Sequence, residues 1–495
     1  MTFHNFLCAM LLPVTLWATA GHGGTHERGV AITDPLTLRE LDSDKLNLGR
    51  LLGAGPDASG AALFALSSMV SARAAIGRQL DRYASNHAAA LAVPTGSGAL
   101  ARLQLLDRAP LYANSTRFML AGIVNRMDRA YVSPQTCGEI RLIYRPVANG
   151  GTAEPTRLPM TLNLVMKASV ERSVQTNSCS GTAGRWLASA DLPLTGADLA
   201  AKMTAQGGSL EPMTPQHIDR IEINIQVARL SPNANDFEAR ADYLMMVFRY
   251  DPRRERFEES PLENQIDRDR ILDDAKLAAD FRQWLFEPGN LEALDRGTVV
   301  IPPQFLAMSA INQTPSSLEG DHGARGLVAD REVVAALANA ASAGIAFENI
   351  LSPAGFMRRL NDITCTGCHQ TRGIGGFHFP GVDASGKAAP GAVIAPASPH
   401  FFGDQERRRD ILAAFRDGRP PDFARGFSAR PQPRRSKELA GTTYVNGWGA
   451  MCYPAGTNTS PDSSFASWTC AEGLTCQAAP GASSSRAGFC FPKNN

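Results

Sequence analysis

The sequence predicts an α+β protein: a largely antiparallel sheet, then a mainly helical segment, then a small cysteine-rich tail. Stretches typical of strands follow one another between residues 116 and 260, whereas helical periodicity dominates beyond residue 325. Four of the nine cysteines lie in the last 44 residues. Strands that come in a run, rather than alternating with helices, favour an antiparallel sheet.

Length and composition limit the classes of protein to consider. A chain of 495 residues is long for one core, and two or three compact units are expected. The 49 basic and 48 acidic side chains leave a net charge of +1, so neither nucleic acid nor anionic lipid is an expected partner. The arginines at 407–409 are interpreted as solvated helix surface.

The first 20 residues are predicted to be a signal peptide. Residues 6–20 are mostly apolar and end in Ala18-Thr19-Ala20, which suits signal peptidase, although no Lys or Arg precedes them. Cys8 lies inside this stretch, which argues against a lipoprotein anchor. No segment reaches the roughly 20 apolar residues needed for a membrane span. We therefore expect an exported bacterial protein, periplasmic or secreted.

Residues 21–325 are assigned to the α+β domain, whose first part is helical or irregular, for example at 63–92. Residues 220–227 alternate polar and apolar side chains, which is typical of a sheet with one solvated face. Residues 160–166 repeat the alternation. Further strands are predicted at 118–124, 140–147 and 243–250, and a helix at 271–285.

Residues 326–420 form the next predicted unit, which is mainly helical. After a helix at 332–341, Ser352 and Pro353 open another, whose apolar face includes Phe356 and Leu360 and which leads directly to Cys365. A Gly/Pro-rich stretch at 373–404 precedes a helix at 405–417. Residues 421–446 are rich in Pro and Arg and are interpreted as a linker.

The motif Cys365-Thr366-Gly367-Cys368-His369 fits the C-x-x-C-H pattern of covalent haem attachment. The two thiols would bind the haem vinyl groups, and His369 would ligate the iron. A redox disulfide, two structural cysteines or half of a zinc site are the alternatives. Zinc would need a second ligand pair, and a thioredoxin-like site would need a βαβ context; neither is present. One covalent haem c is therefore expected.

The other cysteines agree with export. Without Cys8 and the motif pair, six remain, enough for three disulfides in an oxidising compartment. Cys137 and Cys179 are the simplest partners for each other, although spacing does not prove the pairing. The other four belong to the predicted disulfide-rich module at 447–495, which is too small for a core of its own: Cys452, Cys470, Cys476 and Cys490. The tail also holds three aromatic side chains, Trp448, Phe465 and Trp468, which could contact a partner protein. Alternatively, the tail is a cap that stabilises the rest of the chain.

Across roughly residues 350–420 the chain resembles class I cytochromes c. In that family a helix leads into the motif, a loop supplies the sixth iron ligand, usually Met, and a closing helix packs back on the first. The resemblance implies a cytochrome c-like haem domain and electron transfer. This sequence departs from the family at the ligand loop, where Pro399-His400-Phe401 stands in place of a Met.

The sequence does not decide which residue is the sixth iron ligand. His400, in the equivalent loop, is the first choice, His378 on a Gly-rich segment the second, and Met451 the third. Either histidine could instead be packed or hydrogen-bonded. Two histidine ligands would give a lower potential than His/Met ligation, and an iron without a sixth ligand would allow peroxide or oxygen chemistry.

A second set of candidate residues lies where two strands approach a turn. Arg126 and Asp128 end one predicted strand, and Glu139 and Arg141 begin the next. A hairpin would bring them together, where they could bind a substrate or perform acid/base catalysis. The alternative is structural: Asp128 as a cap, Glu139 paired with an arginine across the strands, and Cys137 in a disulfide.

Three functions follow from these observations. The first is an electron-transfer protein with a redox partner protein or a small-molecule electron donor or acceptor. The second is a haem-dependent oxidoreductase or peroxidase with an open iron site, and the third is an extracytoplasmic binding protein with structural haem. No other catalytic signature was found in the sequence.

Overall fold

A computed structural model of the chain describes residues 31–88, 103–149, 156–170, 178–190, 192–229, 240–314, 326–368, 399–430, 445–453, 462–478 and 488–492. The predicted signal peptide, His369 and His378 lie outside these residues.

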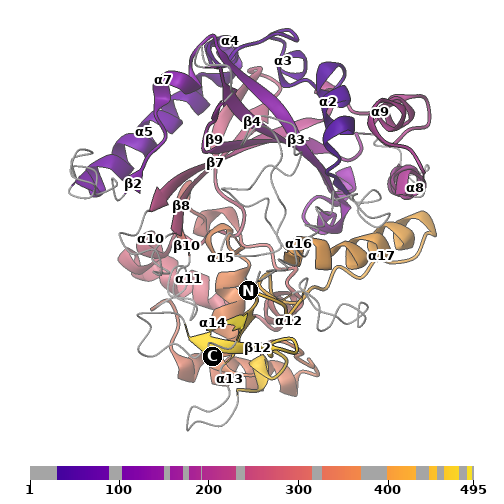
Figure 1. Cartoon of the computed structure of the whole chain (residues 1–495). Helices are drawn as coiled ribbons and strands as arrows, with labels where there is room; N and C mark the ends of the chain where they lie inside the picture. The colour runs from indigo at the N-terminus through magenta and orange to yellow at the C-terminus, as the bar shows by residue number, and fades with distance from the viewer. Residues whose placement is uncertain are drawn as a thin grey trace, which may run out of the picture.

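A ten-stranded sheet lies at the centre of the fold, and each of its strand pairings is antiparallel. Its main path is β1 (Ala31–Ile32), β3 (Thr116–Arg126), β4 (Glu139–Ala148), β6 (Met160–Lys167), β7 (Ile218–Arg229), β8 (Arg240–Asp251) and β10 (Ser309–Thr314). Three more strands pair with β7, β4 and β8, respectively: β2 (Leu103–Gln104), β5 (Thr156–Arg157) and β9 (Arg256–Ser260). Figure 1 shows that the sheet is strongly curled. The predicted antiparallel sheet and its five predicted strands are confirmed.

The two faces of this sheet have different chemistry, because successive residues of a strand point to opposite sides. In β7, Ile221, Ile223 and Ile225 are fully buried in the main hydrophobic core. Arg220 and Gln226 alternate with them, and they too are buried, 7% and 4% exposed. Glu222 and Asn224, the other polar residues of this stretch, are half-buried and line a cavity, so the predicted solvated face is only partly accessible.

Helices from the first half of the chain cover the apolar face, as Figure 1 shows along the outer side of the curl. They are α2 (Pro35–Ser43), α3 (Leu48–Leu51), α4 (Gly60–Ala65), α5 (Val70–Asn86), α7 (Arg108–Leu111), α8 (Ser178–Ala190) and α9 (Gly196–Thr204). The helix predicted at 63–92 is broken at Leu66, whose ψ of 139° is not helical. The helices before β3 therefore belong to the same hydrophobic core as the sheet and do not form a separate unit.

A second hydrophobic core joins helices from both sides of residue 325. It holds α10 (Arg268–Asp273), α11 (Ala275–Leu285), α12 (Pro288–Arg296), α13 (Asp330–Ser342) and α14 (Pro353–Asp362). The helix predicted at 271–285 is interrupted at Asp274, whose side chain accepts hydrogen bonds from the backbone of Lys276 and Leu277 and so caps α11. The core packing continues across the domain boundary predicted at residue 325.

The closing helix of the predicted cytochrome c-like unit packs elsewhere. α17 (Gln405–Arg416), with α16 (Pro399–Gly403) before it, lies against α8, and Leu412 belongs to the core of the sheet. Ser180 of α8 donates a hydrogen bond to the Arg416 carbonyl (2.8 Å). In class I cytochromes c the closing helix packs on the helix before the motif. Here α14 belongs to the second core and α17 to the core of the sheet, so these two helices pack in different places.

Two of the arginines at 407–409, Arg407 and Arg408, are not the solvated surface that was predicted. Arg407 and Arg408 have side chains only 12% and 2% exposed, and both form ion pairs with Asp404 (2.7 Å) and with Asp128. The paired carboxylates compensate the burial of these charges.

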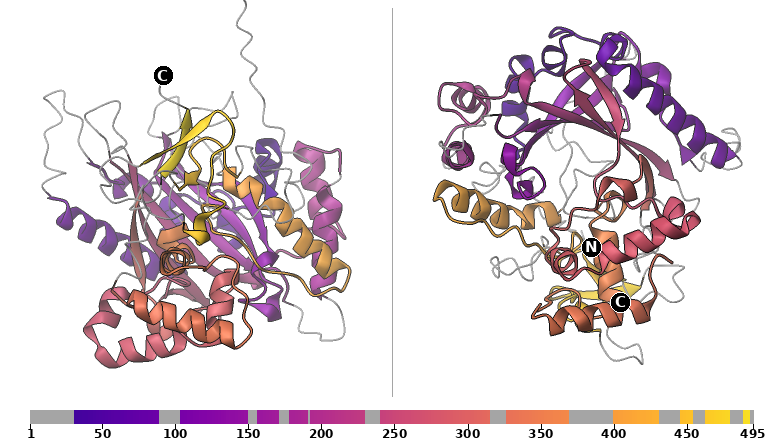
Figure 2. Two further views of the ribbon diagram at one scale, coloured as in Figure 1. Left: turned by 90° about the horizontal axis from the view of Figure 1, so that it is seen from below. Right: turned by 180° about the vertical axis from the view of Figure 1, so that it is seen from behind.

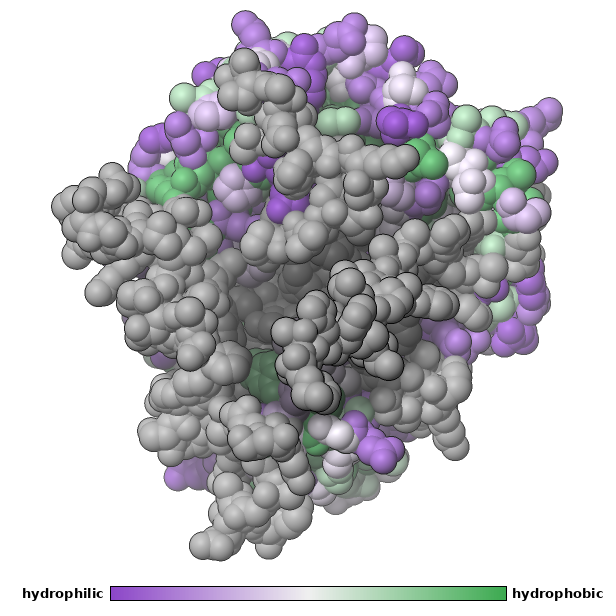
Figure 3. Space-filling model, viewed as in Figure 1, coloured by the Kyte–Doolittle hydropathy of each residue, from purple (hydrophilic) through white to green (hydrophobic). Residues whose placement is uncertain are grey.

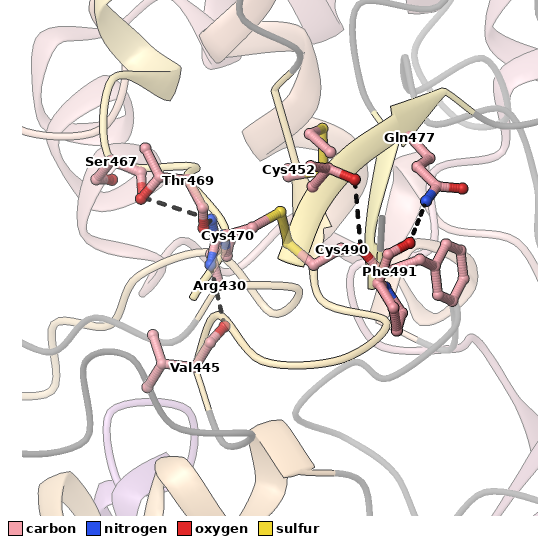
Figure 4. The surroundings of a disulfide bond; sticks show 12 residues. Arg430, Val445, Cys452, Ser467, Thr469, Cys470, Gln477, Cys490 and Phe491 are labelled. Carbon is pink, nitrogen blue, oxygen red and sulfur yellow. Dashed lines mark hydrogen bonds between the residues drawn. A yellow bond between two sulfur atoms is a disulfide. The ribbon is translucent and has the colours of Figure 1, made fainter. Parts of the chain in front are cut away.

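The C-terminal tail folds on α14, as the yellow strands of Figure 2 show beside the orange helices. Its sheet has the order β11 (Met451–Cys452), β13 (Gly488–Pro492) and β12 (Leu474–Ala478), with Cys452 paired to Cys476 and Cys470 to Cys490. Figure 4 shows Arg430 beside the second pair, donating to Val445 O. A Cβ at Gly355 of α14 would collide with Ser464, so the tail and helix are in close contact.

Aromatic side chains and part of the expected linker belong to the same packing. Phe465 and Trp468 are buried with Phe427, whereas Trp448 is 55% exposed. The residues at 426–430 are all buried, and Arg359 of α14 donates to the carbonyls of Gly426 and Arg425. These observations favour the stabilising cap over a surface for partner contact.

On the face of the molecule drawn in Figure 3, the described residues are mainly hydrophilic, with scattered hydrophobic side chains. Within the described residues, no helix is both long enough and apolar enough to cross a membrane.

Candidate functional site

Helix α14 carries the chain to the cysteine motif. Ser352 caps the helix by accepting a hydrogen bond from the Gly355 backbone (2.9 Å), and Pro353 occupies the first turn, as predicted. Phe356 and Leu360 are fully buried in the second core, so this face anchors the helix. The one-turn helix α15 (Cys365–Cys368) follows directly.

The geometry of α15 depends on Thr364 and Gly367. The Thr364 hydroxyl donates to Asn361 O (2.6 Å) and accepts from the Gly367 backbone (2.9 Å). A Cβ at Gly367 would overlap the carbonyl oxygen of Asn361, so only glycine fits here. Thr364 and Gly367 therefore fold the motif tightly against the end of α14.

A loop after β9 fixes α15 from the other side. The Thr366 backbone donates to Gln265 Oε1 (3.0 Å), and the Cys365 thiol lies 3.5 Å from the carbonyl oxygen of Glu263. Asn264 holds this loop by donating to Val299 O (2.9 Å) and accepting from the Ile301 backbone (2.8 Å). The backbone of α15 and the Cys365 thiol are thus held by a loop about 100 residues earlier in the chain.

Cys365 and Cys368 are half-buried and form no disulfide, whereas the six other described cysteines are in pairs. Cys137 and Cys179 are paired, as the sequence suggested. Burial raises the pKa of the Cys365 thiol, and the nearby carboxylates Glu222 and Glu263 raise it further. The thiol is therefore protonated at neutral pH.

A cavity of about 380 Å³ lies between α15 and the polar face of the sheet. Both thiols line it, together with polar side chains of the sheet such as Arg141, Asn163 and Glu222. We call it the arginine cavity, because six arginines line it: Arg126, Arg129, Arg141, Arg220, Arg249 and Arg425. Its volume lies within the range of small-molecule sites.

The hairpin residues predicted as a second site lie beside this cavity. Arg126 pairs with Glu139 in the β3–β4 register, and its side chain binds Asp128 (2.9 Å). Glu139 forms ion pairs with Arg141 (2.7 Å) and with two arginines that sequence reasoning missed, Arg129 (3.3 Å) and Arg220 (2.7 Å). The Cys137 disulfide and the pairing of Glu139 with an arginine of another strand are confirmed, but Asp128 binds arginines and caps no turn. The arginines of the hairpin also form the wall of a cavity.

Glu139 is ionised at neutral pH in spite of its burial. Desolvation opposes its ionisation, but Arg141, Arg220 and Arg129 outweigh that effect and hold the pKa of Glu139 well below its usual range. Asp128 follows the same pattern, with Arg126 as its strongest cationic neighbour. The polar face of the sheet is therefore a fixed array of ion pairs.

His400 is fully buried on the same side of the sheet. The next residue, Phe401, packs on Val124 and Ile143, which alternate with residues of the main core and so belong to the polar face. Cys365 packs on Tyr243 and Met245 of that face, farther along the sheet. His400 is not among the residues that line the cavity.

Met451, the third ligand candidate, has another environment. It is 1% exposed in the cluster that joins the tail to Phe427, and its sulfur lies 3.8 Å from Nη2 of Arg358. It is not a cavity-lining residue.

The two free cysteines meet one requirement of covalent haem attachment, a pair of unpaired thiols. The two thiols are unpaired and lie on the wall of a cavity whose lining also includes apolar Met245, Leu262 and Ile301. Guanidinium groups on the same wall suit the two carboxylates of a haem.

Comparison of the chain with protein-family models, with curated proteins and with solved structures finds no match.

Some cavity residues were not predicted from the sequence, and they differ in whether a local sequence pattern could have identified them. Arg220 and Glu222 lie within the strongest alternating stretch of the chain, so charges on one face of a strand were visible. Arg425 lies in a Pro/Arg-rich stretch with no periodicity, and nothing local indicated its place. Only packing brings it to the site.

Proposed function

We propose that the chain is an exported monohaem c-type protein that transfers electrons through a covalently attached haem. The observation that carries the proposal is the pair Cys365 and Cys368: they are adjacent to His369 in a C-x-x-C-H motif, unpaired, and on the wall of a cavity. When bound, the haem supplies one-electron oxidation and reduction.

The chain's own residues have distinct roles in this proposal. Cys365 and Cys368 form the thioether bonds, and His369 ligates the iron from the next position in the chain. Thr364 and Gly367 set the spacing of the thiols through the contacts of α15. Gln265 and Asn264 keep α15 against the cavity.

The resemblance to class I cytochromes c enters the proposal in a limited form. It is supported by the motif and by the capped amphipathic helix α14 before it. Since α17 packs on α8, the haem environment would be built from the polar face of the sheet and not from a closing helix. The large sheet would then be part of the haem site.

His400 remains our first candidate for the sixth ligand, with His378 second. The support for His400 is its complete burial on α16, over the sheet face on which Cys365 also packs. Bis-His ligation would favour a low reduction potential.

Export is supported by the apolar segment that ends at Ala20 and by the three cysteine pairs. Disulfides persist in oxidising compartments, which agrees with a periplasmic or secreted protein. The partner would be a redox protein or a small-molecule electron donor or acceptor.

A haem-dependent oxidoreductase is the second candidate, and the cavity is the observation that favours it. Polar side chains such as Arg141 and Asn163 converge on the cavity wall next to both cysteines, where they could bind and orient a substrate beside the haem.

The optical spectrum of the purified exported protein tests these proposals. A reduced α-band, with haem retained on the chain after denaturation, is expected. Release of all haem on denaturation would contradict covalent attachment. A low-spin ferric spectrum that becomes high-spin in His400→Ala supports the carrier with His400 as ligand. A high-spin spectrum in the wild type supports the oxidoreductase.

A further inference from the structure

The charge on the wall of the arginine cavity is unbalanced. Among the described residues that line it, there are six arginines but only two carboxylates, Glu222 and Glu263. Glu139, Asp128 and Asp219 stand behind the wall and complete the ion pairs. Against these five carboxylates together, the six arginines leave one positive charge in excess.

Five of the arginines are held by carboxylates. Arg126 pairs with Asp128, Arg249 with Asp219, and the remaining three with Glu139 and its neighbours. Their guanidinium groups are fixed before any ligand arrives, which lowers the entropy cost of binding. These five form a preorganised wall that is close to neutral.

Arg425 is the exception. Its Nε donates to Gly297 O (3.3 Å) and its Nη1 to the Ser428 hydroxyl (3.1 Å), and both acceptors are neutral. Among the residues that the structure describes, no carboxylate pairs with Arg425, and none accepts a hydrogen bond from its Nη2. Arg425 thus provides an uncompensated positive charge on the cavity wall.

We propose that the arginine cavity binds a carboxylate on a largely apolar molecule, with Arg425 as the principal cation. A planar guanidinium matches a carboxylate through two parallel hydrogen bonds. Met245, Leu262 and Ile301 supply an apolar wall for the rest of the molecule. The combination of apolar lining and a few fixed polar groups is typical of small-molecule sites.

The carboxylate has two possible sources, which share this chemistry. It belongs either to the side chains of the attached haem, in which case the inference rests on the proposed function, or to a diffusible carboxylic acid. Benzoate is a suitable probe for both, because it joins one carboxylate to a small apolar ring.

Calorimetric titration with benzoate at low ionic strength tests the site. The full-length chain with Cys365→Ser and Cys368→Ser cannot attach haem and should bind benzoate. Adding Arg425→Gln should weaken this binding about tenfold, the effect of losing one charge-assisted hydrogen bond. Arg425→Lys, which keeps the charge, should lose less. The matched control is Arg253→Gln on the exposed β8–β9 turn, which should bind like its parent.

The wild type separates the two sources. If the haem-loaded wild type no longer binds benzoate, the haem carboxylates fill the site; if it still binds, the ligand is diffusible. If the wild type carries no haem, the proposed function fails, while the same titration on that protein still tests the cavity. Equal affinity in Arg425→Gln and Arg253→Gln, or no binding by any haem-free form, overturns the inference. Should Arg425→Gln fail to fold, the milder Arg425→Lys takes its place: it should still bind benzoate less tightly than Arg253→Gln, and equal affinity would again overturn the inference.

Discussion

Two buried carboxyl groups on opposite faces of the sheet have pKa values shifted in opposite directions. Asp42 on α2 lies over the apolar face, and burial raises its pKa from about 3.8 to about 7. Glu139 on β4 lies on the polar face, and its pKa is well below the usual value despite its burial. Both groups leave water, so burial alone cannot explain the difference.

The neighbours of each carboxyl decide the outcome. Asp42 accepts a hydrogen bond from the Leu120 backbone (3.2 Å), which offsets only part of the desolvation. Glu139 is surrounded by three guanidinium groups, whose attraction exceeds the cost of burial. One sheet thus has a carboxyl group with a pKa of about 7 on one side and an array of ions on the other.

Gly367→Ala should have the largest effect, because it disrupts the helix that meets the polar face. The added Cβ would overlap Asn361 O, so α15 must move and both thiols with it. We expect covalent haem incorporation to be lost, measured by haem staining of the denatured chain. The control is Gly289→Ala on α12, where a Cβ meets no atom within 4 Å and incorporation should be normal. Normal incorporation in Gly367→Ala would contradict the role of α15.

Glu139→Gln should break the ion array of the polar face. It leaves Arg129, Arg141 and Arg220 without their shared carboxylate, and removing one partner from a buried ionic cluster costs about 3–5 kcal/mol. Urea unfolding at pH 7 measures the loss. The control is Glu258→Gln, which removes the exposed ion pairs of Glu258 on β9 and should leave the free energy of unfolding unchanged. Similar stabilities for both variants would show that the array is not needed for folding.

Asp42→Asn should remove a pH dependence that belongs to the apolar face. Since the folded-state pKa of Asp42 is raised to about 7, its stabilising protonation is complete below about pH 4 and is lost as the pH rises towards 7. The wild type should therefore lose up to about 4 kcal/mol over this range from Asp42 alone. The amide variant should lack that loss. Parallel stability curves from pH 4 to 7 would contradict the assignment.

Leu142→Ala and Ile143→Ala compare the two faces at adjacent positions of β4. Leu142 is fully buried in the main core, while Ile143 packs in the small cluster with Phe401 of α16. Both should be destabilising, Leu142→Ala by about 3 kcal/mol and Ile143→Ala by about 1 kcal/mol less. Only Ile143→Ala should alter the haem spectrum, because α16 carries His400. Identical spectra in both variants would argue against His400 as a ligand.

Much of the local structure could be predicted because it follows from local patterns. The alternation at 220–227 and the Ser352-Pro353 start of α14 correspond to β7 and to a capped helix. The missed breaks at Leu66 and Asp274 involve single residues inside otherwise periodic stretches. The candidate hairpin at Arg126 and Glu139 was recognised, but its cavity was not, because the other wall lies more than 200 residues away.

The sequence by itself determined the antiparallel strands, the pairing of six cysteines among themselves, and the C-x-x-C-H motif that leaves Cys365 and Cys368 apart. These are properties of residue type and short spacing. Only the tertiary structure decided that much of the polar face of the sheet is covered, that Arg407 and Arg408 pair with carboxylates away from solvent, and that α15 faces an arginine-lined cavity. Each of these depends on contacts between remote segments, and no local pattern of hydrophobicity or charge specifies which remote segment will cover a given face.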